Sequence, residues 1–248
     1  SSVLLTGCTP SQEEIDRYNQ LIVDADLLVE GMEYSSAMEK LNDATQVIPS
    51  KYEGYERIVD ILILKNRVED AKKLIDESAN KLSEKDRALL YVEVGKAFYE
   101  NREYSKALVC YELANVADSS IDSTKLEIAK LHLQQGDVEK AKGILKGSLD
   151  ESVNQEAKLI YSYILSTTDI EKAEDAIAGV QPSEELKEGY AKWLEVLSSL
   201  DEDDLFNRAK LANSYLDSGY PYLAILVLEP VKDDMSEYID GLYLLGKA

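Results

Sequence analysis

The chain has 248 residues, and its low content of proline and glycine beside 45% hydrophobic residues favours helix and argues against disorder. Its 48 acidic and 27 basic residues leave a net charge of −21, which repels phosphate backbones and argues against nucleic acid as a partner. Basic peptides, cations or the simple solubility of an acidic surface remain as explanations of this charge. No apolar run of about eighteen residues is present, so the sequence predicts no membrane-spanning helix.

The first residues form an apolar run that ends in Leu5, Thr6, Gly7 and Cys8. This pattern resembles the lipobox of bacterial lipoproteins. The resemblance implies that residues 1–7 are the remnant of a signal peptide, that Cys8 is the lipid attachment site and that residues 8–14 form a tether. A chance match of four residues is the alternative. Because the chain starts with Ser1 and ends within a repeat, we expect it to be a piece of a longer protein.

A pattern with a period near 34 residues follows, and small residues mark it. Ala37, Ala71, Ala107 and Ala141 are 34, 36 and 34 residues apart. The unit at 88–121 is the clearest, because two amphipathic stretches flank a break at Asn101 and Arg102. One apolar face of each stretch is defined by Tyr91, Val94, Gly95 and Phe98, and then by Tyr104, Ala107, Tyr111 and Ala114. Gly95 and Ala107 are expected where the two antiparallel helices cross most closely.

This order of large and small residues resembles the tetratricopeptide repeat. The resemblance covers about residues 15–248 and implies an all-α fold, a right-handed α-solenoid of helical hairpins. About six units are expected, with an extra helix and a terminal half-repeat. They lie near residues 18–51, 52–86, 88–121, 122–154, 155–182 and 204–235, with the extra helix at 183–200 and the partial unit at 236–248. The extra helix carries the single tryptophan, Trp193, and Gly246 occupies the small position of the partial unit.

Local motifs for chemistry are missing, since the sequence contains no phosphate-binding loop, GxSxG elbow, HExxH helix or EF-hand loop. The single histidine, His132, takes the slot that Phe98 takes one repeat earlier, which predicts a packed imidazole. Cys110 has apolar neighbours and is expected to be a core residue with an inert thiol. Neither cysteine has a spacing suited to zinc. We therefore expect no catalytic residue, no metal and no cofactor.

The acidic run Asp201–Asp204 precedes a helix that is expected to start near Leu205. Calcium is one interpretation, but the run lacks the spaced ligands and the glycine of a calcium loop. Carboxylates at this place complement the positive end of a helix dipole. The sequence favours an ordinary helix start.

The first helix of each tetratricopeptide hairpin lines a concave face in that family. The resemblance carries this face onto Asp60, Ile63, Leu89, Val92, Lys96, Tyr99, Leu126, Lys130 and Leu133. Family members that bind a carboxyl terminus use Lys, Asn and Arg here, whereas this chain has Glu56, Asp60, Val92 and Glu93. We expect a partner segment with apolar anchors and basic character. The alternative is an empty groove whose leucines contact neighbouring repeats.

These features predict a non-catalytic protein–protein interaction scaffold. The lipobox resemblance implies a bacterial lipoprotein anchored to a membrane, facing the periplasm or the extracellular side, which recruits partners in cell-envelope assembly or secretion. Two alternatives stay open: a docking region of a larger protein whose active domain lies outside this chain, and a soluble cytoplasmic scaffold.

Overall fold

The computed structural model describes residues 9–149, 154–237 and 239–248, and across these residues the fold is all-α, without a strand. The chain divides into two compact units, one ending at Ile121 and one beginning at Asp122. The helices of the first unit are α1 (Gln12–Glu30), α2 (Tyr34–Val47), α3 (Tyr52–Leu64), α4 (Val68–Glu77), α5 (Glu84–Glu100) and α6 (Tyr104–Ala117). Those of the second are α7 (Asp122–Gln134), α8 (Val138–Leu149), α9 (Gln155–Ser166), α10 (Ile170–Ile177), α11 (Glu184–Ser198), α12 (Asp204–Asp217), α13 (Pro221–Leu228) and α14 (Ile239–Lys247), with short 3₁₀ turns at Glu229–Val231 and Asp234–Glu237.

One turn geometry recurs between paired helices. The residue at its centre has a positive φ, and the next amide donates a hydrogen bond to the carbonyl five residues earlier, which is the Schellman ending of a helix. The five donor–acceptor pairs, at 2.7 or 2.8 Å, are Glu33 to Leu28, Arg67 to Leu62, Glu103 to Phe98, Asp137 to His132 and Tyr220 to Tyr215. The central residues are Met32, Asn66, Arg102, Gly136 and Gly219. Identical turns fold each of these helix pairs into the same hairpin.

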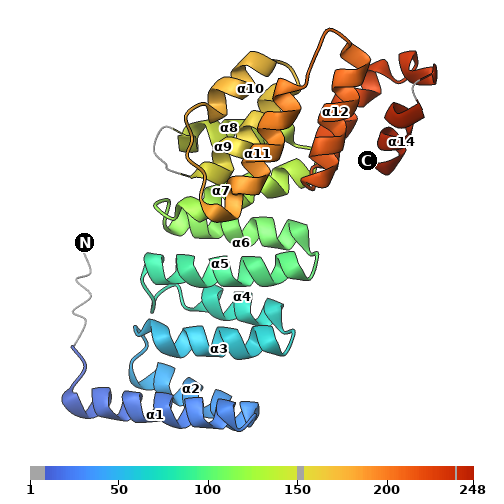
Figure 1. Ribbon diagram of the computed structural model, residues 1–248. Helices are drawn as coiled ribbons and strands as arrows, with labels where there is room; N and C mark the ends of the chain where they lie inside the picture. The colour runs from blue at the N-terminus through green and yellow to red at the C-terminus, as the bar shows by residue number, and fades with distance from the viewer. Residues whose placement is uncertain (1–8, 150–153, 238) are drawn as a thin grey trace, which may run out of the picture. The chain divides into compact units, whose positions relative to one another are not determined.

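The first unit stacks its hairpins as successive antiparallel layers (Figure 1). The small positions Ala37, Ala71 and Ala107 are fully buried, as the repeat pattern predicts. At Gly95 the close approach is to a ring: a Cβ there would lie 3.0 Å from Cε1 of Tyr111 on α6. A buried polar contact also ties α1 to α3, because the Gly54 amide donates to the Tyr18 hydroxyl at 2.9 Å.

The second unit has an aromatic centre built around α11. Trp193 is fully buried, and its ring centroid lies 4.6 Å from that of Tyr163 in an edge-to-face contact. The indole N–H donates to the Ser162 hydroxyl at 2.8 Å, and that hydroxyl donates to the Ala173 carbonyl at 2.6 Å. The unpaired helix α11 is therefore held to α9 and α10 by packing and by a satisfied polar chain.

Candidate protein-binding surface

The α3–α5 face consists of Glu56, Asp60 and Ile63 on α3 and of Leu89, Val92, Glu93, Lys96 and Tyr99 on α5, two helices that pack against each other. It contains the six predicted binding residues of the first unit. Asp60, Leu89 and Lys96 are exposed, and Ile63, Val92 and Tyr99 are half-buried. The face thus offers apolar side chains beside charged ones, all on rigid helices.

Three carboxylates give this face its electrostatic character. Burial, together with the charges of Asp60 and Glu56, raises the pKa of Glu93 to about 7 against a smaller opposing effect of Lys96. The pKa of Asp60 is raised as well, first by burial and then by Glu56. One oxygen of Glu93, Oε2, is buried without a hydrogen-bond partner. A cationic group that a partner brings over the three carboxylates would relieve the repulsion among them.

The predicted binding residues of the second unit behave differently. Leu126 and Leu133 are 6% and 1% exposed and belong to the hydrophobic core of that unit, so the expectation that they face a partner is wrong. Helix α7 packs against α13, a helix that lies far from it in the sequence. Lys130 is half-buried and its ammonium pairs with Glu127 at 3.2 Å and Glu156 at 2.6 Å. Its charge is neutralised within the chain.

The His132 imidazole and the Cys110 thiol are both buried. His132 is 7% exposed, which confirms the packed imidazole, and its Nδ1 lies 3.3 Å from a carboxylate oxygen of Asp137. Cys110 is fully buried, and burial raises the pKa of its thiol to about 12. A thiol with this pKa stays protonated at neutral pH and is a poor nucleophile. Among the described residues, no group of three or more His, Cys, Asp and Glu side chains is placed to hold a metal ion.

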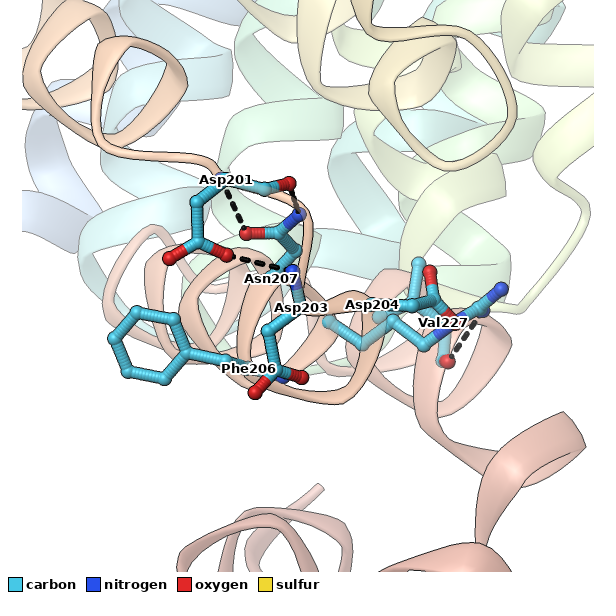
Figure 2. Close-up of polar contacts among 7 residues, drawn as sticks. Asp201, Asp203, Asp204, Phe206, Asn207 and Val227 are labelled. Carbon is cyan, nitrogen blue, oxygen red and sulfur yellow. Dashed lines mark hydrogen bonds and ion pairs between the residues drawn. The ribbon is translucent and has the colours of Figure 1, made fainter.

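The acidic run before α12 acts as a helix cap (Figure 2). The Asp203 carboxylate accepts a hydrogen bond from the Phe206 amide at 3.1 Å, and the Asp201 carboxylate accepts one from the Asp203 amide at 2.8 Å. The Asp204 carboxylate pairs with Arg208 at 2.7 Å. The expected helix start is confirmed, one residue earlier than Leu205.

Sequence reasoning missed a groove in the second unit. It lies among α11, α12 and α14, has a volume of about 1180 Å³ and includes Trp193 and Tyr243 in its lining. The extra helix predicted at 183–200 was the one feature of the sequence that could have indicated this groove. A helix without a partner leaves a flank open, but its sequence does not say which flank.

The proposed lipid attachment site, Cys8, lies outside the described residues. Within the described part of the chain, no helix has both the length and the hydropathy to cross a membrane.

No family model and no curated protein matches the chain. Among solved structures, the chain is similar to pilF of Pseudomonas aeruginosa, with 13% identity over 96% of this chain and 100% of that one and a TM-score of 0.47. It is also similar to a tetratricopeptide repeat protein from Parabacteroides merdae ATCC 43184, with 16% identity, 88% and 80% coverage and a TM-score of 0.49. The recurrent turns and buried small residues described above define the fold without them: an all-α protein of tetratricopeptide-like helical hairpins.

Proposed function

We propose that this chain is a non-catalytic scaffold that binds a protein partner on the α3–α5 face. One observation carries the proposal: half-buried Glu93 lies beside Asp60 and Glu56, so three carboxylates share one partly desolvated patch at the surface. Such a group costs folding stability, and groups of this kind persist where function requires them. Leu89 and Val92 lie on the same helix as Glu93, within one turn of it, and supply apolar anchors.

The partner is a segment with Lys or Arg beside an apolar side chain. A cation over the three carboxylates gains more at a partly desolvated site than in water, since the pairs there are less screened. The burial of both Cys110 and His132 supports a binding role over a catalytic one.

The test compares two matched substitutions of exposed apolar residues in the first unit. Leu89→Lys changes α5 at a position 38% exposed, and Val109→Lys changes α6 at a position 46% exposed. Partners captured from the source cells are quantified with each variant. We expect one discrete protein to be retained by Val109→Lys and lost with Leu89→Lys. Equal retention by both variants would show that the α3–α5 face does not bind it.

We further propose that the scaffold is a bacterial lipoprotein, acylated at Cys8 and held at the envelope, where its partners take part in assembly or secretion. The Leu5–Cys8 motif supports this, because the thiol follows a small residue after an apolar run. Each buried CH₂ of an acyl chain contributes about 0.8 kcal/mol to membrane attachment. Labelled palmitate is expected in the full-length protein and not in Cys8→Ser. Label in both proteins, or in neither, contradicts the anchor and leaves the binding face untouched.

A further inference from the structure

The groove in the second unit is bounded by helices alone. Its lining comes from α9 (Tyr163), from α11, from α12 with the residue that follows it, and from α14 (Tyr243 and Leu244). Its volume of about 1180 Å³ exceeds what small-molecule sites usually occupy, and it is open to solvent. These dimensions suit a segment of polypeptide.

The floor of the groove is apolar and already fixed. Beneath it, Tyr163 and Trp193 pack edge to face at 80°, the indole N–H donates to Ser162, and the two side chains are 5% and 0% exposed. Val196, which is half-buried, offers apolar surface in the lining. At the edge, Tyr243 is 69% exposed, a large aromatic side chain that the fold leaves in water. A partner with apolar side chains would cover it.

The walls carry a net negative charge. Glu185, Glu188, Glu195 and Asp217 line the groove together with two lysines. Both lysines have partners within the chain. The Lys192 ammonium pairs with Glu188 at 2.6 Å. The Lys210 ammonium donates to the Ser199 carbonyl at 2.8 Å and lies 4.1 Å from the centroid of the Phe206 ring. The Asp217 carboxylate accepts a hydrogen bond from the Asn213 amide at 3.2 Å, which leaves Glu185 and Glu195 to face a cation from outside.

We propose that this groove binds an amphipathic helix of a partner protein, with its apolar face against Val196 and Tyr243 and with Lys or Arg beside Glu185 and Glu195. A helix satisfies its own backbone hydrogen bonds, so side-chain contacts with the groove are enough to bind it. A helix of about 10 Å diameter takes roughly 120 Å³ per residue, so the groove accommodates two to three turns. A second copy of this chain, at a net charge of −21, is disfavoured by its own acidity.

This proposal rests on the proposed function only because it takes the occupant of the groove to be a protein segment. The groove lies in the second unit, whereas the α3–α5 face lies in the first. The probe is a synthetic helix of about 16 residues with Leu at i, i+3, i+4 and i+7 and Lys elsewhere, and its counterpart has Glu in place of Lys. Each peptide carries a fluorescent label, and the anisotropy of its emission reports binding. We expect a saturable change with the Lys peptide and none with the Glu peptide.

Two double variants with the same change of charge locate the site. Glu185→Gln with Glu195→Gln removes two carboxylates from the groove, and Glu171→Gln with Glu174→Gln removes two exposed ones from α10. The first double variant should lower the affinity for the Lys peptide about tenfold, at roughly threefold per exposed contact. The second should leave this affinity unchanged. Thermal unfolding followed by circular dichroism checks that both variants fold.

Several results would overturn the proposal. These are binding of both peptides alike, equal affinities for the two double variants, or no change in anisotropy with either peptide. Dimers of the protein alone, dispersed by Tyr243→Asp in sedimentation, would assign the groove to a second copy instead. Leu89→Lys should bind the Lys peptide as the parent protein does, so loss of the cellular partner in that variant reports on the α3–α5 face and not on the groove.

Discussion

Replacing Glu93 with Gln should stabilise the protein at alkaline pH. The carboxyl has a pKa of about 7 in the folded chain against an ordinary value of 4.5. At 1.36 kcal/mol per pH unit the difference corresponds to about 3 kcal/mol, and solvent screening at this half-buried site reduces it to about 1–2 kcal/mol. Gln has a similar volume and helix propensity and carries no charge, so it removes the repulsion from Asp60 and Glu56.

The sign follows from proton binding. Between pH 4.5 and 7 the folded chain retains a proton on Glu93 that the unfolded chain has released, so the free energy of unfolding falls as the pH rises through this window. Above pH 7 the penalty is constant, and below pH 4.5 it vanishes. The advantage of Glu93→Gln should therefore be absent at pH 4 and complete at pH 8.

Urea denaturation at pH 4, 6 and 8 measures this, with Glu112→Gln, an exposed carboxylate of α6, as the matched control. The control should track the parent protein at each pH. If Glu93→Gln is no more stable than the parent at pH 8, or if its advantage is already full at pH 4, the carboxylate is not strained and the argument from Glu93 to a partner cation fails.

Two further predictions concern packing. Gly95→Ala places a Cβ 3.0 Å from the Tyr111 ring and should lower the free energy of unfolding in urea by about 1–2 kcal/mol. Gly143→Ala on α8 places a Cβ with nothing within 4 Å and should raise the free energy of unfolding by about 0.5–1 kcal/mol. Ser162→Ala leaves the buried indole N–H of Trp193 without its acceptor and should cost about 1–3 kcal/mol in unfolding followed by tryptophan emission. Ser198→Ala, at an exposed position of α11, is its control and should stay within about 0.5 kcal/mol, and equal effects of the two serine changes would contradict the polar chain.

The sequence predicted the features that depend on periodicity within a hairpin. The all-α architecture, the buried alanines and the packed imidazole of His132 are confirmed, because a residue's place on a helix determines which side faces its own partner helix. The capping role of the run before α12 was predicted for the same reason, since the positive end of a helix is a local property.

The features that depend on distant helices were not predicted. Leu126 and Leu133 match Val92 and Tyr99 in register, yet they are buried, because burial of that side depends on what packs on α7. The turns at Met32 and Arg102 adopt positive φ without glycine, and a sequence carries no clear sign of that. The groove beside α11 depends on how an unpaired helix settles against its neighbours.

Site-specific photo-crosslinking in living cells tests the central claim most directly. A photoreactive amino acid is placed at Leu89 on the α3–α5 face or at Glu112 on α6, two exposed positions of the same unit. The account predicts one discrete cross-linked protein from position 89, none of it from position 112, and loss of the adduct when Asp60→Lys is added. Cross-linking of the same protein with equal yield from both positions, or an adduct at position 89 that Asp60→Lys leaves unchanged, would contradict it.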